Sequence, residues 1–291
     1  MLQHIFDAAA TGSLYAVIAL GIALVFGVMR LVNFAYGELL MVGGYVVLLT
    51  AGLPWPLIVA CTLAAVGIVA FLMERIAFRP VREADPTTML ITSFAVSILL
   101  QNIAVWIAGR RPKGVSFGSS LSEPVDIAGA SVPIVEPVTL GVVAASLILF
   151  VFIMRKTELG VQMRAAAEDF RMARLMGVRA DSVIVAAFVA SGVLAAIAAL
   201  LLVATTGSVS PYMGLQPVLI GFVATVIGGM GSLIGAAVGG FALGAVTVLL
   251  QVVLPESVVS YRDAFVFSFV ILVLLAWPQG LFANRAAEER V

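Results

Sequence analysis

The sequence is poor in the residues that most enzymes depend on. It has one cysteine, Cys61, and one histidine, His4, which excludes an intrachain disulfide, a cysteine-based metal site and paired imidazoles. Charged residues make up 11% of the 291 residues, and the 16 basic and 16 acidic side chains cancel, so no net charge attracts nucleic acid. Walker A and HExxH motifs are absent. We therefore expect no enzyme activity, no cofactor and no metal site.

What the sequence has in excess is apolar side chains, which make up 62% of the chain. A soluble core of this length cannot hide so many of them, so the excess must face lipid. Because a helix needs about 20 mostly apolar residues to cross a bilayer, the sequence predicts an all-α polytopic bundle of about 8–10 spans, with broken or re-entrant Gly-rich segments. Residues 1–291 are expected to form a single transmembrane domain. The candidate spans are 11–29, 34–52, 57–78, 88–109, 137–154, 183–204, 217–229, 232–254 and 262–277.

Two polar intervals suggest how the chain is oriented. Residues 155–182 hold six of the 16 basic side chains, and basic residues accumulate on the cytoplasmic side. We therefore place 155–182 and the C-terminus in the cytoplasm, and the N-terminus outside. Residues 110–136 then lie outside, where their Gly, Ser and Pro with alternating Val and Ile predict a small hairpin or loop. The basic cluster Arg110, Arg111 and Lys113 would then lie outside, which opposes this scheme. Most of the other basic residues fall on the cytoplasmic side when the spans alternate from 155–182.

The first motif, FGVMRLVNFAYGELLMVGGY (26–45), places a carboxylate in an apolar stretch. A charge at membrane depth costs at least ~2.5–3.5 kcal/mol, so Glu38 must be paired or line a watery cavity. Two interpretations stay open: Glu38 lines a substrate path, or it lies near the membrane surface and pairs with Arg30. The glycines Gly37, Gly43 and Gly44 permit either close helix packing or a broken helix.

The second motif is the glycine-rich stretch 221–246, which contains GGMGS (228–232) and two GxxxG pairs, Gly235–Gly239 and Gly240–Gly244. Small residues at this spacing let helices approach closely. We expect a helix break at 228–232 in or near the membrane and glycine-mediated packing after it. The resemblance to the Gly43-Gly44 region hints at a weak internal repeat.

The third motif, GVQMRAAAEDFRMARLMGV (160–178), predicts a short helix between two spans, with Gly177 as its C-terminal stop. Phe170, Met172, Leu175 and Met176 would present apolar side chains from a cytoplasmic loop. Such a helix either lies on the lipid surface or inserts into a groove of a partner protein. The residues alone do not choose between the two.

These three motifs, in this order, resemble LivH-type permeases, the membrane subunits of ABC importers for branched-chain amino acids. NFAYGE (33–38) with Met41 and the following glycines resembles the family signature, 160–177 its coupling segment, and GGMGS its second glycine-rich signature. The resemblance covers nearly the whole chain. Tyr36 departs from it, because most relatives are expected to have His or Gln there, so the cargo could differ.

The resemblance implies a permease domain in the bacterial inner membrane, driven by other subunits. The partners would be a second permease (a sister chain or a second copy), two cytoplasmic ATPases and an extracytoplasmic solute-binding protein facing 110–136. Related permeases carry leucine-type amino acids, other amino acids, amides or urea. The residues expected to couple the chain to the ATPases are Ala167, Glu168, Asp169, Phe170, Arg171, Leu175 and Gly177.

The alternative from another class is an ion-coupled secondary carrier of small solutes. A carrier needs an ionisable residue cycling within the membrane, and Glu38 and Glu74 are the candidates. An exposed helix between spans would have no use in such a protein. In either case, the residues expected along the substrate path are Asn33, Tyr36, Glu38, Gly43, Gly44, Thr92, Ser93 and Gln101.

Overall fold

The computed structural model describes residues 2–82, 84–115, 117, 124–127, 130–255, 257–277 and 280–282. Its regular structure is almost entirely helical, as the composition predicts. The helices are α1 (Leu2–Met29), α2 (Tyr36–Thr50), α3 (Trp55–Leu72), α4 (Pro86–Ala108), α5 (Val135–Lys156), α6 (Glu158–Glu168), α7 (Phe170–Leu175), α8 (Ala180–Thr206), α9 (Leu215–Gly228), α10 (Leu233–Val253) and α11 (Arg262–Ala276). Short π- or 3-10-helical turns are η1 (Met73–Phe78), η2 (Arg79–Val81) and η4 (Val259–Tyr261).

The apolar helices of the described chain differ in length. Six of them are long and apolar enough to cross a membrane, whereas α2 and α9 are apolar but shorter. With 15 and 14 residues, α2 and α9 rise about 22 and 21 Å, less than the ~30 Å of bilayer hydrocarbon. Each stretch predicted to span contains a helix, and the prediction of an all-α membrane bundle with broken segments is confirmed.

Helix α1 forms the centre of the bundle, with 83% of its apolar stretch buried. It packs against α5, α8, α9 and α10. Glycines permit the closest of these approaches, since a Cβ at Gly240 would lie 2.6 Å from the Cα atom of Ala16. Gly244 lies in the same way against Gly12, so α10 runs antiparallel to α1. The predicted role of the second glycine motif in helix packing is therefore confirmed.

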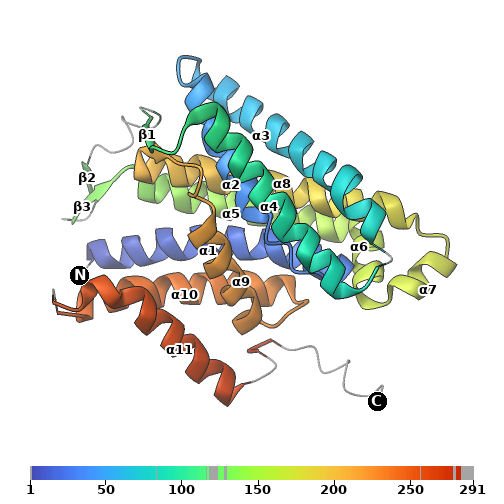
Figure 1. Cartoon of the computed structure of the whole chain (residues 1–291). Helices are drawn as coiled ribbons and strands as arrows, with labels where there is room; N and C mark the ends of the chain where they lie inside the picture. The colour runs from blue at the N-terminus through green and yellow to red at the C-terminus, as the bar shows by residue number, and fades with distance from the viewer. Residues whose placement is uncertain are drawn as a thin grey trace.

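The bundle has two distinct ends. Figure 1 shows α1 running from the end where the chain starts toward the end where α6 and α7 lie, which we call the α7 end. The opposite, N-terminal end carries strands β1 (Lys113–Gly114), β2 (Pro124–Ile127) and β3 (Ala130–Pro133) (Figure 1). β2 and β3 form the predicted hairpin, and β1 pairs with β4 (Ser208–Val209). Residues 116, 118–123 and 128–129 of the predicted loop lie outside the described residues.

The two short helices begin next to each other inside the bundle. The Tyr36 side chain at the start of α2 packs against Gly21, about 12 Å from the end of α1 at 1.5 Å per residue. A Cβ at Gly37 would lie 2.7 Å from the carbonyl oxygen of Gly214, just before α9. From this contact, α2 runs toward the N-terminal end and α9 toward the α7 end. Both helices therefore start at membrane depth.

The break that makes α2 short lies before the glycines, not at them. Arg30 adopts a left-handed conformation with φ of 55°, and the Asn33 side chain accepts a 3.0 Å hydrogen bond from the Ala35 N–H, so residues 30–35 leave the helix. Helix α2 is continuous through Gly43 and Gly44. Of the two roles left open for these glycines, close packing is the one observed: Gly43 lies against Ala199 of α8.

Candidate functional site

A buried polar cluster lies where α2 and α4 meet. Glu38 is 1% exposed, and its Oε1 atom accepts a 2.8 Å hydrogen bond from the Ser97 hydroxyl and a 2.7 Å bond from the Gln101 amide. Ser97 lies about 17 Å along α4 from Pro86, near the middle of that helix. We call Glu38, Ser97 and Gln101 the mid-membrane cluster. It holds a carboxylate at the depth where a charge is most costly.

The described residues supply no positive charge to this carboxylate. None of their ion pairs involves Glu38, whose two hydrogen-bond donors are both neutral. The Oε2 atom of Glu38 is buried and has no partner. Arg30 instead donates a 3.3 Å hydrogen bond to the carbonyl of Ala167. The interpretation that Glu38 lies near the surface and pairs with Arg30 is therefore wrong, because the turn at Arg30 directs that side chain toward the α7 end.

Three phenylalanines lie beside the mid-membrane cluster. The Phe34 ring stacks on Phe94 of α4 at a centroid distance of 4.6 Å, and it meets Phe222 of α9 at 5.7 Å. Phe94 precedes Ser97 by three residues in α4, about one helical turn, and Phe34 lies in the turn just before α2, so this aromatic wall adjoins the Ser97 side of the cluster. A carboxylate and an apolar surface thus adjoin at one site.

Helix α4 covers this site but is held loosely. Only 17% of its apolar stretch is buried, and its buried residues are Met89, Ser93 and Ser97. Its packing partners within the described chain are α2 and the turn η1. The hydrogen bonds to Glu38 and the Phe34–Phe94 stack therefore make up much of what fixes α4 to the bundle.

The other predicted path residues do not join the cluster. The buried Tyr36 hydroxyl has no hydrogen-bond partner and lies against Gly21. The Thr92 and Ser93 hydroxyls donate to the carbonyls of Thr88 and Leu90 in their own helix. Asn33 caps the turn before α2, and Gly43 and Gly44 pack against Ala199 and Met213.

Sequence reasoning missed Ser97, which completes the cluster. Ser93, Ser97 and Gln101 are four residues apart, so they share one face of α4. This polar stripe on an otherwise apolar helix was the available signal, and it marks the face that α4 turns toward α2.

At the α7 end, the predicted single helix is divided in two. Asp169 lies between α6 and α7, and its Oδ1 atom accepts a 2.9 Å hydrogen bond from the Met172 N–H, which caps α7. Gly177 follows α7 with φ of 90°, so its predicted role as the stop is confirmed. Because Asp169 leaves the helical conformation to cap α7, α6 ends at Glu168 and the predicted helix is interrupted there.

The predicted coupling residues divide into exposed and inward-facing ones. Leu175 is 77% and Met176 is 85% exposed, and Met172 is exposed as well. Phe170 is half-buried and packs against the main core, so it anchors α7 from inside. The side chain of Arg171 lies outside what the structure describes. Of the remaining predicted residues, Glu168 and Gly177 are exposed, while Ala167 and Asp169 are half-buried.

Ion pairs and hydrogen bonds tie this segment to the spans. Asp181 at the start of α8 accepts from Arg79 at 2.5 Å and from Arg82 at 2.6 Å, which joins the turn after α3 to α8. Arg164 of α6 donates to the carbonyl of Met154 at the end of α5. A displacement of α6 therefore reaches α5 through Arg164, the end of α1 through the hydrogen bond from Arg30 to the Ala167 carbonyl, and α8 through direct packing.

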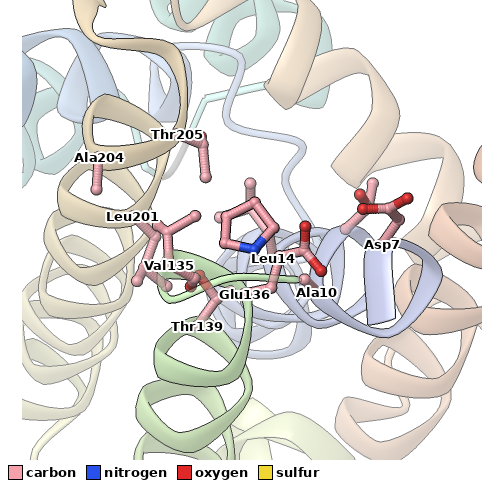
Figure 2. Close-up of a pocket in the computed structure, with 11 residues that line it drawn as sticks. Asp7, Ala10, Leu14, Val135, Glu136, Thr139, Leu201, Ala204 and Thr205 are labelled. Atoms are coloured by element: carbon pink, nitrogen blue, oxygen red, sulfur yellow. The ribbon is translucent and has the colours of Figure 1, made fainter. Parts of the chain in front are cut away.

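A cavity of about 410 Å³ opens at the N-terminal end between α1, α5 and α8. Figure 2 shows the carboxylates of Asp7 and Glu136 in its lining, with Thr139 and Thr205 nearby. Across the described residues, no three His, Cys, Asp or Glu side chains gather closely enough to hold a metal ion. The cavity is therefore an acidic recess on the side opposite α7.

Comparison with known proteins adds independent findings. Residues 4–275 match the family model described as "Branched-chain amino acid transport system / permease component". The chain is 33% identical over 302 residues to the high-affinity branched-chain amino acid transport system permease protein LivH of Salmonella typhimurium, covering 99% of this chain and 97% of that protein. It is 32% identical over 307 residues to BraD of Pseudomonas aeruginosa, a permease protein described in the same terms, with the same coverage.

Two more distant similarities concern part of the chain and the fold, respectively. The autoinducer 2 import system permease protein LsrC of Yersinia pseudotuberculosis is 30% identical over 176 residues, covering 57% of this chain and 48% of that one. Among solved structures, PsaBC from Streptococcus pneumoniae in complex with Fab superposes with a TM-score of 0.52 at 15% identity, covering 93% of this chain and 91% of that one. At this identity the similarity concerns the fold alone.

Proposed function

The chain belongs to the family of permease components of branched-chain amino acid transport systems, and from this premise we propose that it is the membrane-spanning subunit of an ABC importer for branched-chain amino acids. It is a multi-pass membrane protein and a transport component, not an enzyme. Full-length similarity to LivH and BraD supports amino acids as cargo, whereas the similarity to LsrC covers only part of the chain. Other amino acids, amides and urea are the alternative cargoes.

The single observation that carries this proposal is the segment at the α7 end. Met172 and Leu175 of the six-residue helix α7, and Met176 directly after it, are exposed, while Asp169 caps the helix and Phe170 packs its inner side on the core. A rigid apolar projection on a polar end of a membrane protein fits the groove of a partner. We assign the groove to a cytoplasmic ATPase subunit. Each permease of a pair would then bind one of two ATPases.

The distribution of charge supports a cytoplasmic α7 end. Basic side chains concentrate there, and such an excess marks the cytoplasmic face. They are Arg30, Arg79, Arg82, Arg155, Lys156, Arg164, Arg174 and Arg179. The N-terminus, the β2–β3 hairpin and the acidic recess then face the outside of a bacterial inner membrane, where a solute-binding protein delivers its cargo.

The mechanism follows from these two regions. Closure of the ATPases on ATP would move α6 and α7. The hydrogen bonds of Arg30 and Arg164, and the packing of α6 against α8, carry that motion to α1, α5 and α8. The bundle then changes between outward- and inward-facing states around the site where α2 and α9 begin. The energy comes from other chains, which agrees with the missing Walker motif.

Reconstitution tests this function directly. Proteoliposomes that contain this chain, its partner permease, the ATPases and the binding protein are expected to accumulate radiolabelled leucine only with ATP. Omitting the ATPases is expected to abolish uptake. Accumulation driven by a proton or sodium gradient without ATP would contradict the proposal and favour a secondary carrier. Preference for an amide or urea over leucine would change the proposed cargo but would still agree with an ABC importer.

A further inference from the structure

The mid-membrane cluster points to a binding site for one part of the cargo. We infer that the Oε2 atom of Glu38 binds the ammonium group of an apolar α-amino acid while the aromatic wall of Phe34, Phe94 and Phe222 receives its side chain. The inference rests on the proposed function and deepens it, because it assigns the chemistry that recognises the substrate within the membrane.

The charge of the cluster supports the ammonium assignment. Both donors to Glu38, Ser97 and Gln101, are neutral and both bind Oε1, so the second oxygen is buried and unpartnered. A buried carboxylate is stabilised by a cation that approaches closely enough to form charge-assisted hydrogen bonds. An ammonium group offers three such donors. The substrate itself carries the cation that the described part of the chain does not provide to Glu38.

The spacing of the cluster and the wall supports an amino acid. Phe94 lies three residues before Ser97 in α4, about 4.5 Å along the helix axis, and Phe34 stacks on Phe94 from the turn that precedes α2. The ammonium group and the branched side chain of an aliphatic amino acid are joined through one carbon atom and reach over a similar length. Aromatic faces bury an aliphatic side chain well and also attract a nearby cation.

Access to the site requires only that α4 moves. Parting α4 from α2 breaks two hydrogen bonds and one aromatic stack, and it exposes the carboxylate and the Phe34 ring together. Helix α4 is the least buried of the six long apolar helices in the described chain, and it packs mainly on α2 and η1, so few contacts within the chain oppose this separation. The site is closed in the present conformation and opens along one helix.

The test uses the reconstituted complex and three variants. Glu38→Gln keeps the size of the side chain and removes its charge. Glu38→Gln/Gln101→Glu returns the charge to the same cluster from the α4 side, so amide and carboxylate exchange places. Asn102→Ala alters an exposed residue of α4 next to the cluster and serves as the control. Leucine uptake and binding-protein-stimulated ATP hydrolysis are measured for each.

The expected results distinguish a role of Glu38 in leucine binding from a role in the stability of the fold alone. Glu38→Gln is expected to lower leucine uptake by about 100-fold, the loss typical of removing one partner of a buried charge pair, while ATP hydrolysis stays within about twofold. The exchanged pair is expected to restore uptake at least about tenfold over Glu38→Gln, since the attraction acts over a few ångströms. Asn102→Ala is expected to match the wild type.

Other outcomes would overturn the inference. Uptake by Glu38→Gln at wild-type level would show that no charge is needed, and a joint loss of assembly, hydrolysis and uptake without rescue would show that the cluster only pins α4. Loss of wild-type uptake when choline replaces sodium would mean that the carboxylate binds an inorganic cation. A wild-type complex that hydrolyses ATP but takes up no leucine would instead contradict the proposed function.

Discussion

Two glutamates at different depths show what distinguishes the centre of the bundle from its α7 end. Glu38 and Glu74 are each 1% exposed. Glu74 lies in the π-helical turn η1, within electrostatic reach of Arg79 and Arg82, which also bind Asp181. Glu38 has only the neutral donors Ser97 and Gln101. Burial is therefore equal, and the compensating charge differs.

The difference separates a structural region from a binding region. At the α7 end, charges of both signs meet and form a frame that holds the coupling segment. At the centre, a carboxylate is held by neutral hydrogen bonds alone. The Oε2 atoms of Glu38 and Glu74 both lack a hydrogen-bond partner, but only Glu74 has arginine charges within electrostatic reach. Because an uncompensated buried charge is costly, a carboxylate that no cation of the described chain faces indicates a site that a ligand completes.

The largest expected effect comes from stripping the neutral donors from Glu38. The double variant Ser97→Ala/Gln101→Met leaves a buried carboxylate without any partner, and we expect it to lose about 3 kcal/mol of stability. Adding Glu38→Met makes the site apolar and is expected to restore stability but not leucine uptake. Thermal unfolding in detergent and uptake in proteoliposomes measure the two effects. Normal leucine uptake by the triple variant would show that the polar cluster is not needed for binding, and that the centre has only a structural role, as the α7 end does.

The next effect concerns the exposed face of α7. Leu175→Asp is expected to weaken binding of the ATPase subunits by about 2 kcal/mol, or roughly 30-fold, as loss of an apolar interface anchor does. Titration of purified ATPase onto the permease complex measures it. Glu158→Gln, at the exposed start of α6, is the control and should bind as the wild type does. Unchanged affinity for Leu175→Asp would place the docking surface elsewhere.

A smaller effect is expected at the contact between the two short helices. A Cβ at Gly37 would lie 2.7 Å from the Gly214 carbonyl oxygen, so Gly37→Ala is expected to cost about 1.5 kcal/mol through overpacking. Gly67→Ala in α3 meets nothing within 4 Å and is expected to be neutral. The two melting temperatures give the comparison. Equal values would mean that α2 and α9 are not held at this point.

The smallest effect is expected where charges pair in partial exposure to solvent. Asp181, Arg79 and Arg82 are all partly exposed, so their pairs are screened. Asp181→Asn is expected to cost under about 1 kcal/mol and to reduce the salt dependence of stability. Melting at low and high salt measures this. A cost as large as that of the double variant at Ser97 and Gln101 would erase the contrast between the two regions.

Much of the fold could be predicted because lipid imposes simple rules on composition. The length and apolarity of the spans, the hairpin in 110–136 and the stop at Gly177 follow from local residue preferences. The depth at which α2 begins does not, because it depends on the turn at Arg30 and on the contact between Gly37 and Gly214, which are far apart in sequence.

The site was predictable only in part, because local sequence marks some of its residues while contacts between distant helices determine the others. A carboxylate in an apolar stretch singles out Glu38, and the resemblance to LivH-type permeases adds Phe170 and Leu175. Which of these two faces outward depends on Asp169, since capping by its side chain ends α6 and turns Phe170 toward the core. Ser97 became evident only when α4 was placed beside α2, because a serine within an apolar helix usually bonds to its own backbone.

The ratio of leucine imported to ATP hydrolysed tests the central claim, which is that substrate recognition and energy input reside in separate regions of this chain. It is measured in one proteoliposome preparation for the wild type, Glu38→Gln and Leu175→Asp. We predict that Glu38→Gln hydrolyses ATP while importing almost no leucine, so its ratio collapses. Leu175→Asp should lose both activities together and keep the wild-type ratio. A ratio that stays at the wild-type value in Glu38→Gln, with both activities reduced alike, would contradict the account.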